Sequence, residues 1–195
     1  MNNKIDIIIP WLNPNDSWYN EYKKYAKNEH PGRVRDLGIF KYLLRSISRN
    51  CPWVNKVFVV LYDETQKPEW LNEGKKLKVI YHKDFIPKKY LPNFNSVLTD
   101  MHFSFIEELS DNFIFMNDDM IFMKPTPETM YFENNLPVHQ GSIQLGRYVD
   151  KTPAQWKYIE RNIYSFVSRL VGKDVLYTTH HLPIPFNKTI QQFIW

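Results

Sequence analysis

The sequence predicts an α/β fold built around a doubly wound, mostly parallel open sheet. Short apolar runs of strand length alternate along the chain with segments whose apolar residues recur every three or four positions, as they do in helices. The 195 residues are 43% hydrophobic and 16% aromatic, which is enough to bury one core of ordinary size. Because no internal repeat or Gly/Ser-rich linker divides the chain, we expect one domain that spans residues 1–195.

The first expected strand, Ile5–Ile9, is a nearly continuous apolar run closed by Pro10. This pattern is typical of a strand that is buried on both faces of a parallel sheet, so we expect it at the centre. Further strands are expected at Val57–Leu61, Lys78–Tyr81 and Asn112–Met116. Ligands of such a sheet bind outside the carboxyl ends of its strands, so the segments that follow the strands are the first place to look for a site.

Helices are expected between several of these strands. The firmest places Ile39, Leu43 and Ile47 on one face and must end before Pro52. The others are expected from Ser17 to about Lys27, from Ser96 to Leu109 and from Gln155 to Leu170. The last two carry apolar stripes, formed by Val97, Met101, Phe105 and Leu109 in one and by Trp156, Ile159, Ile163, Phe166, Val167 and Leu170 in the other. Gly172 is expected to end the last helix.

Composition argues against several classes of protein. The formal charge of +4 mildly favours anionic ligands and is far too small to indicate a nucleic-acid partner. No apolar run approaches the roughly 20 residues that cross a bilayer, so any membrane association would be peripheral. Cys51 has no second cysteine to pair with, and the chain starts on a strand instead of a signal peptide. We therefore expect a cytoplasmic protein, with peripheral contact at the inner face of the membrane left open.

The most informative motif is Asn117-Asp118-Asp119, which lies between the apolar runs 113–116 and 120–123. Two adjacent carboxylates beside apolar strands are costly unless a cation offsets their charge. Mg²⁺ and Mn²⁺ prefer carboxylate oxygens and leave positions open for waters and substrate phosphates. We therefore expect Asp118 and Asp119 to bind one of these cations, with a diphosphate as the implied ligand. A plain turn between two strands is the alternative.

The loop after the first strand, Trp11–Trp18, is a second candidate. In a doubly wound sheet it opens on the ligand crevice, where Asn13 and Asp16 suit hydrogen bonds to a base or ribose. An Asn-Pro turn followed by Ser17 as a helix cap explains the same residues without a ligand. Trp11 is a ligand-stacking candidate as well, although such tryptophans more often pack in a core.

Charged and imidazole side chains elsewhere are weaker candidates. Asp36 precedes an apolar helix and is a helix cap, an ion-pair partner or a general base, with capping the simplest of these. Lys41 and Arg45 are four residues apart, so they can hold phosphates together or form a solvated basic face. His180 and His181 can exchange a proton near neutral pH, but neighbours in a strand face opposite ways, so one at most points into a given site.

Several ordered motifs resemble the Stealth family, which includes bacterial capsular polysaccharide phosphotransferases and the catalytic subunit that makes the mannose-6-phosphate tag on lysosomal enzymes. The segment from Ile5 to Asp16 is similar to the first family block. The second block is resembled by Arg35-Asp36-x-Gly38, Leu43-x-Arg45-Ser46-Ile47, Pro52-Trp53-Val54-Asn55-Lys56, Pro68-Glu69-Trp70-Leu71, His82-Lys83-Asp84, Leu91-Pro92-x-Phe94-Asn95-Ser96 and Phe113-Ile114-x-x-Asn117-Asp118-Asp119-Met120. His181-Leu182-Pro183-Ile184-Pro185 is similar to the third block. Together they cover nearly the whole chain.

The resemblance implies a glycosyltransferase-A-like fold and an enzyme of sugar-1-phosphate transfer in capsular or cell-surface polysaccharide synthesis. The implied donor is a UDP-sugar such as UDP-N-acetylglucosamine, the acceptor is a glycan hydroxyl, and UMP is released. By the same resemblance Asp36 and His181 are catalytic, and Asp118 and Asp119 lie near Mg²⁺ or Mn²⁺ and the diphosphate. The implied substrate-binding residues are Trp11, Asn13, Asp16, Lys41, Arg45, Asn95, Ser96 and Asn117.

The chain also departs from the family pattern. Pro14 stands where the family usually has Gly, Leu37 where Asn is common, and Lys41 where Arg is frequent. The fourth family block, which carries a further basic catalytic residue, has no counterpart before Trp195, as in a catalytic domain truncated at its C-terminus. Two alternatives stay open: a metal-dependent glycosyltransferase that releases UDP, and a non-catalytic domain that binds sugar nucleotides or carbohydrate.

Overall fold

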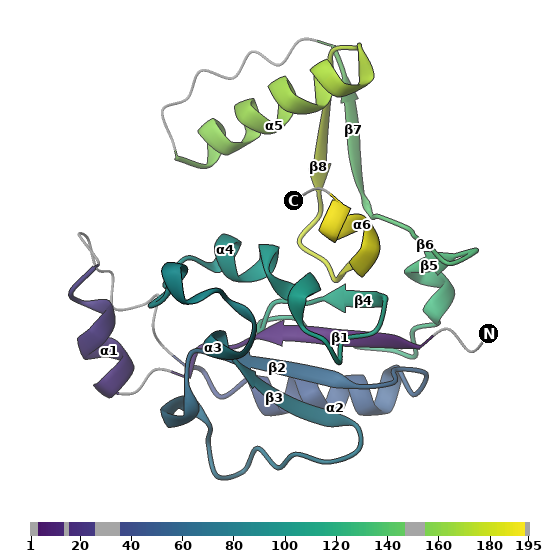
Figure 1. Ribbon diagram of the computed structural model, residues 1–195. Coiled ribbons are helices and arrows are strands. Elements are labelled where there is room, and N and C mark those ends of the chain that lie inside the picture. Colours follow the sequence, from purple (N-terminus) through teal and green to yellow (C-terminus); the bar gives the residue numbers. More distant parts are fainter. Residues whose placement is uncertain (1–3, 14–15, 26–35, 147–154, 194–195) are drawn as a thin grey trace. The chain divides into compact units, whose positions relative to one another are not determined.

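The computed structural model describes residues 4–13, 16–25, 36–146 and 155–193 of the chain (Figure 1). Its contacts divide the chain into two compact units. The first unit comprises Met1–Val138 together with Pro183–Trp195, and the second comprises His139–Leu182. Within the described residues, every helix is too short or too polar to span a bilayer.

The first unit is built on a mostly parallel sheet. Its strands are β1 (Ile5–Pro10), β2 (Val57–Leu61), β3 (Leu77–Tyr81), β4 (Asn112–Phe115) and β9 (Ile184–Asn187), in the order β3-β2-β1-β4-β9. The first four are parallel, and β9 is antiparallel to β4 at the edge. The α/β prediction is confirmed, and β1 is central as the apolar run indicated.

Both faces of this sheet are covered, which explains the continuous apolar strands. Ile7 and Ile9 pack in one core cluster with the inner face of α2 (Phe40–Asn50), while Ile8 packs in a second cluster with α3 (His82–Phe85) and the segment around Phe103 (Figure 1). All three isoleucines are fully buried. The predicted amphipathic helix before Pro52 is therefore confirmed.

A buried carboxylate holds the amino ends of the central strands together. Asp6 in β1 is fully buried. Its Oδ1 accepts hydrogen bonds from Asn55 Nδ2 at 2.7 Å and the Lys56 amide at 3.0 Å, and its Oδ2 accepts one from the Ser110 amide at 2.7 Å. These donors come from the segments that lead into β2 and β4, so Asp6 fixes both neighbours of β1.

The predicted helix from Ser96 to Leu109 is wrong in length and in its buried face. The helix α4 is Ser96–Met101, and a 3₁₀ turn, η4 (Phe103–Phe105), follows it. The exposed fractions of Val97, Met101 and Phe105 are 57%, 39% and 48%, whereas Phe103, Ile106 and Leu109 are buried. The buried residues are three apart, which suits 3₁₀ turns, and the four-residue spacing that predicted one long helix lies mostly on the surface.

Shorter elements complete the first unit. The hairpin of β5 (Phe132–Glu133) and β6 (Leu136–Pro137) turns at Asn134 and Asn135, whose φ angles of 49° and 67° suit a tight two-residue turn. The remaining elements are α1 (Asp16–Tyr22), η2 (Glu64–Gln66), η3 (Lys88–Tyr90), η5 (Glu128–Met130) and α6 (Lys188–Phe193). The first helix ends at Tyr22 and a turn follows at residues 23–25, so the expected helix to about Lys27 is wrong in length.

The second unit is a helix against a hairpin. Strands β7 (Gly141–Leu145) and β8 (Val175–Thr179) are antiparallel, and α5 (Gln155–Val171) packs against β8, where Leu176 is buried. Ser168 Oγ, which bonds both the amide and the carbonyl of Val175 at 3.1 Å, joins the helix to the strand. Gly172, with φ of 67°, ends the helix as predicted.

Candidate active site

A cavity of about 330 Å³ opens at the carboxyl ends of β1, β2 and β4 in the first unit. After β1 the chain builds β2 and β3 on one side and then crosses to build β4 on the other, so this cavity lies at the switch point of the sheet. Its lining consists of Pro10, Trp11, Leu12, Trp18, Val60, Tyr62, Gln66, His82, Asn93, Phe94, Asn95, Ser96, Thr99, Asn117 and Asp118. Sequence reasoning placed the site at this end of the strands.

Asp118 is the acidic side chain that lines this cavity. Burial raises the pKa of its carboxyl group, and the nearby carboxylates of Asp119 and Asp36 raise it further. The three carboxyl groups of Asp36, Asp118 and Asp119 therefore act on one another at the carboxyl ends of the strands. Such an arrangement stores repulsion that a bound cation would relieve.

The carboxylates of Asp118 and Asp119 fit a cation that keeps several of its water ligands. The described residues contain no group of three or more His, Cys, Asp or Glu side chains placed to hold a metal ion. Asp118 lines the cavity, and Asp119 beside it is exposed. Two carboxylates with open positions suit Mg²⁺ or Mn²⁺, which are commonly bound through one or two carboxylates plus substrate phosphates.

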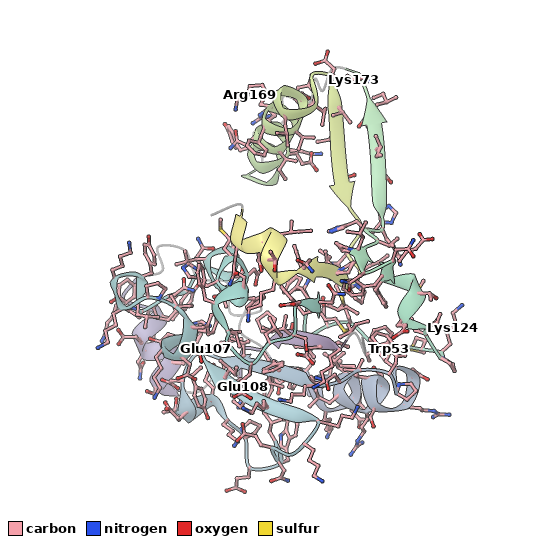
Figure 2. All side chains as sticks on the ribbon, turned by 45° about the vertical axis from the view of Figure 1, so that its right-hand side comes forward. Trp53, Glu107, Glu108, Lys124, Arg169 and Lys173 are labelled. Atoms are coloured by element: carbon pink, nitrogen blue, oxygen red, sulfur yellow. The ribbon has the colours of Figure 1, made fainter. Side chains whose placement is uncertain are left out.

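The segment after Asp119 is fixed to the end of α2, although the expected apolar strand at residues 120–123 does not form. The Phe122 amide donates to Ser46 Oγ at 3.1 Å, and Asn50 Nδ2 donates to the Phe122 carbonyl at 2.5 Å. Trp53 Nε1 donates to the carbonyl of Thr126 at 2.6 Å; Figure 2 labels Trp53. These bonds hold the exit of the Asp118-Asp119 turn in place.

Asp36 is exposed just before α2. Its Oδ1 accepts a hydrogen bond from the Gly38 amide at 2.8 Å, and Gly38 has φ of 68°. The N-cap residue of α2 is Ile39, and no side-chain bond from the described residues caps this end. The capping interpretation of Asp36 is therefore wrong. The carboxylate instead closes a local turn within electrostatic range of Asp118.

Aromatic rings form much of the cavity wall. Trp11 is buried and stacks on Phe40 with ring centroids 4.3 Å apart, so it packs in the core and lines the cavity at once. Tyr62 and Phe94 stack at 5.3 Å, and Trp18 meets Phe94 edge-on at 6.0 Å. The cavity therefore offers flat apolar surfaces beside its acidic end.

The predicted polar residues of the site have different positions. Asn95, Ser96 and Asn117 line the cavity, and Asn95 Oδ1 also caps α4 by accepting from the Val97 amide at 3.0 Å. Asn13 Nδ2 donates to the Gln66 carbonyl at 2.6 Å, which supports a residue of the lining. Asp16 begins α1, and its side chain lies outside the described residues.

The structure does not bring Lys41 and Arg45 into this cavity. Both are exposed on α2 and line a separate cavity of about 290 Å³, together with Leu44, Trp70, Leu71, Asn72 and Leu77. Lys41 Nζ and Arg45 Cζ lie 5.3 and 5.5 Å from the ring centre of Tyr42. Their contact with substrate phosphates remains a prediction.

His180 and His181, the first residue of the third motif, belong to the second unit and follow β8 instead of lying within it. Both are exposed. His180 Nε2 and Ser142 Oγ are 3.0 Å apart, and the His180 amide donates to the Gln140 carbonyl at 3.3 Å. The catalytic role of His181 remains a prediction.

Sequence reasoning missed several polar residues of the cavity, among them Gln66, His82 and Asn93. His82 lies in a motif that carries the family resemblance, which was an available signal. Gln66 lies in the short turn η2, where no sequence pattern marks it. Asn93 is buried and donates from Nδ2 to Thr99 Oγ1 at 2.8 Å, so it shapes the wall between β3 and α4.

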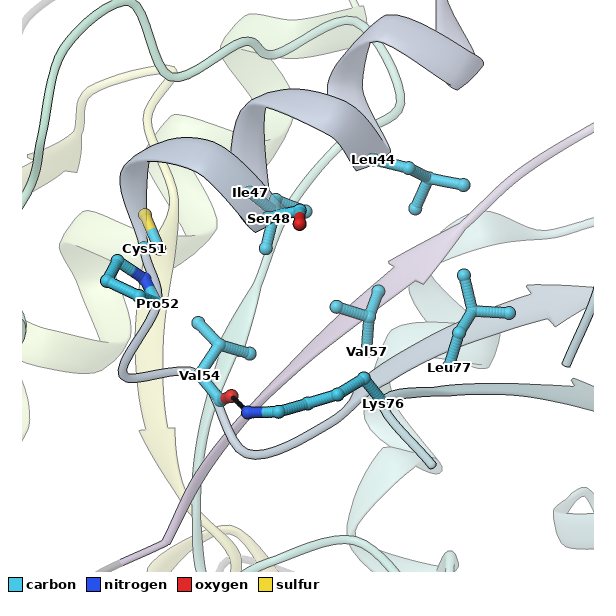
Figure 3. A pocket seen from close by; sticks show the side chains of 9 residues that line it. All are labelled: Leu44, Ile47, Ser48, Cys51, Pro52, Val54, Val57, Lys76 and Leu77. Atoms are coloured by element: carbon cyan, nitrogen blue, oxygen red, sulfur yellow. Dashed lines mark hydrogen bonds between the residues drawn. The ribbon is translucent and has the colours of Figure 1, made fainter. Parts of the chain in front are cut away.

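A third cavity, of about 180 Å³, lies at the amino ends of β2 and β3 (Figure 3). Its walls are mostly apolar and include Leu44, Ile47, Val54, Val57 and Leu77. Lys76 Nζ donates to the Val54 carbonyl, and burial raises the pKa of Cys51 to about 11, so its thiol stays protonated near neutral pH. Among the described residues, the side chains at this end of the sheet pack against one another and include no candidate catalytic group.

An open, mostly parallel sheet with an acidic, aromatic-walled cavity at its switch point defines an α/β fold of the glycosyltransferase-like class. Comparison with known families then narrows this class. Residues 33–139 match the family model described as Stealth protein CR2, conserved region 2, and that region supplies most of the cavity lining. The chain belongs to the Stealth family.

Similar curated proteins agree with this family. The capsular polysaccharide phosphotransferase WcwK of Streptococcus pneumoniae is 38% identical over 100% of this chain and 69% of its own length. The capsular polysaccharide phosphotransferase eps5J of Streptococcus thermophilus is 35% identical over 68% of this chain and 59% of its own length. LcbA of Aeromonas hydrophila, another capsular polysaccharide phosphotransferase, is 34% identical over 67% and 39%. The chain therefore spans between 39% and 69% of the length of these relatives.

Proposed function

We propose that this chain transfers a sugar-1-phosphate from a UDP-sugar to a hydroxyl of a glycan and releases UMP, in the synthesis of a capsular or cell-surface polysaccharide. The observation that carries the proposal is the acidic switch-point cavity, whose Asp118 lies inside the family match. The names of the similar proteins support phosphotransfer in capsule synthesis. The preferred donor in this proposal is UDP-N-acetylglucosamine.

In this proposal Asp118 and Asp119 hold Mg²⁺ or Mn²⁺. The cation, when bound, supplies the positive charge that stabilises the charge developing on the diphosphate. The raised pKa of Asp118 supports this assignment, because a carboxylate destabilised by burial and by neighbouring acids gains from a cation. Asn117, which also lines the cavity, then lies beside the same ligand.

The reaction forms one phosphorus–oxygen bond and breaks another. The acceptor oxygen attacks the sugar-bearing phosphorus, and the bond from that phosphorus to the bridging oxygen breaks, so the electron pair leaves with UMP. In this proposal Asp36 takes the acceptor proton, which its exposure and its electrostatic effect on Asp118 support, and His181 is the other candidate for this role. Phosphoryl transfer depends mainly on positioning and on charge stabilisation, which these residues supply.

We further propose that this reaction takes place in the cytoplasm. The one cysteine, Cys51, is a buried free thiol, as suits a reducing compartment. Peripheral association with a membrane-bound polysaccharide-synthesis complex belongs to the same proposal, because it would place the enzyme beside a growing glycan.

Identification of the released nucleotide tests this function. The purified protein is incubated with UDP-N-acetylglucosamine, Mg²⁺ or Mn²⁺ and a panel of oligosaccharide acceptors, and the nucleotides are separated by chromatography against a control without acceptor. UMP together with a phosphodiester-linked product is the expected result. Release of UDP would instead assign a glycosyltransferase, and donor binding without turnover would assign a binding domain.

A further inference from the structure

We propose that Gln66 and His82 form a nucleobase-reading subsite of the switch-point cavity and recognise the amide edge of uracil. This inference rests on the proposed function, because it names how the cavity selects the nucleotide of its donor. Both residues line the cavity, and each carries a buried polar atom that has no hydrogen-bond partner in the described part of the chain: Gln66 Nε2 and His82 Nδ1.

Gln66 offers a donor of fixed orientation. Its side chain is fully buried, and its Oε1 accepts a hydrogen bond from the Tyr62 amide at 3.0 Å. That bond assigns the carbonyl end of the amide, since the Tyr62 amide can only donate. The Nε2 group is therefore left with its N–H donors directed elsewhere. A buried donor without a partner destabilises the protein, and a hydrogen bond to a ligand oxygen would offset that cost.

His82 offers the complementary acceptor. The backbone of Asn93 raises the pKa of the ring, as an acceptor beside a ring N–H does, and Nδ1 has no partner in the described residues, so we assign the ring proton to Nε2. Burial lowers the pKa of His82 to about 4, so the imidazole is neutral near pH 7. A neutral ring that donates through Nε2 keeps its lone pair on Nδ1. Nδ1 can therefore accept a hydrogen bond from a ligand N–H group.

Aromatic rings beside these atoms suit a flat base. His82 meets Tyr62 edge-on with centroids 5.6 Å apart, and Tyr62 stacks with Phe94 at 5.3 Å. All three line the cavity, and aromatic rings of this kind stack favourably with the flat face of a nucleobase. Uracil presents an N3–H donor between two carbonyl acceptors, which are the kinds of partner that His82 Nδ1 and Gln66 Nε2 lack.

The test is a binding cycle that alters the ligand and the protein in turn. Affinities of the wild-type protein for UDP, 3-methyl-UDP, CDP and ADP are measured by calorimetry with Mg²⁺. Methylation at N3 removes the donor for His82, and we expect it to weaken binding at least tenfold, with CDP and ADP weaker than UDP. This comparison needs no variant, so it holds even if a substitution disturbs folding.

Protein variants complete the cycle. His82→Phe keeps a ring and removes the acceptor, so UDP should bind about tenfold more weakly while 3-methylation has little further effect. Gln66→Glu keeps the acceptor for Tyr62 and removes the donors, and it should weaken UDP binding similarly. Gln144→Glu, at an exposed position of β7, is the matched control and should leave affinity unchanged.

The outcomes separate this inference from the function on which it rests. Equal affinity for UDP, 3-methyl-UDP, CDP and ADP would overturn base reading and leave a nucleotide-binding enzyme. An undiminished effect of 3-methylation in His82→Phe would overturn the assignment to His82. Failure of every nucleotide to bind the wild-type protein would overturn the proposed function itself.

Discussion

The two ends of the parallel strands in the first unit differ in chemistry although the same strands build both. At the amino ends, the cavity around Cys51 and Val54 is mostly apolar, and Lys76, its one charged lining residue, is hydrogen-bonded to the protein itself. At the carboxyl ends, the larger cavity contains Asp118, whose pKa is raised, and two buried polar atoms that have no partner among the described residues.

Two carboxylates make the contrast sharper. Asp6, near the amino ends, is fully buried, yet three hydrogen bonds from Asn55, Lys56 and Ser110 satisfy it. Asp118, at the carboxyl ends, is only partly buried, and its surroundings raise its pKa. A buried charge that is fully hydrogen-bonded supports the fold, whereas a cavity carboxylate whose charged form is disfavoured by burial and by neighbouring acids is suited to a cationic ligand.

The largest effect is expected at Asp118. Asp118→Asn should lower turnover about a hundredfold or more, because a bound cation supplies several kcal/mol of charge stabilisation. Turnover of UDP-N-acetylglucosamine is measured over a range of Mn²⁺ concentrations. Asp111→Asn, an exposed carboxylate before β4, is the control and should keep wild-type activity. Full metal-dependent activity in Asp118→Asn would show that the cation binds elsewhere.

Asp6 should affect stability instead of chemistry. Asp6→Asn cannot accept from all three donors, and a hydrogen bond to a charged group contributes about 1.5–3 kcal/mol, so we expect a loss of about 3 kcal/mol in the free energy of unfolding. Urea denaturation measures this value, with Asp111→Asn again as control. A change below about 1 kcal/mol would mean that Asp6 does not hold the strands together.

Asp100 in α4 should make stability depend on pH. Burial raises its pKa from 3.8 to about 7, and its Oδ1 has no partner in the described residues. A carboxyl group with a raised folded-state pKa costs stability as pH rises from about 4 to 7, because the unfolded chain ionises first. Asp100→Asn should therefore raise the melting temperature more at pH 8 than at pH 4.5, by roughly 4–8 °C. An equal shift at both pH values would argue against a buried carboxyl group here.

The smallest effect is expected in the amino-end cavity. Val54→Ile adds one methylene to a cavity of about 180 Å³, so the free energy of unfolding should change by less than about 1.5 kcal/mol. Turnover should stay within about twofold of wild type. A large loss of activity with unchanged stability would show that this end also takes part in function.

Much of the fold follows from local sequence patterns. Strand β1 is a run of isoleucines that only a two-sided core explains, and α2 has a clear apolar face. The edge strand β9 was missed because it is short and contains Pro185, which suits an edge but weakens the strand pattern. The segment from Ser96 was misjudged because spacings of three and four both fit its apolar residues, and only packing chooses between them.

The candidate site was predicted less completely. Asp118 was found because two carboxylates directly after an apolar strand are unusual in sequence. Lys41 and Arg45 share a helix face, but spacing alone does not say which cavity that face lines. Gln66 was missed because no local pattern marks it, and His82 was missed although it lies in a family motif, because burial without a partner in the described residues is a tertiary property.

A crystal structure of the protein soaked with Mn²⁺ and UMP tests the central claim most directly. The account predicts an anomalous peak for Mn²⁺ at Asp118 and Asp119, with the uracil ring against Gln66 and His82 in the carboxyl-end cavity. A nucleotide in the amino-end cavity, or a metal peak away from both aspartates, would contradict it.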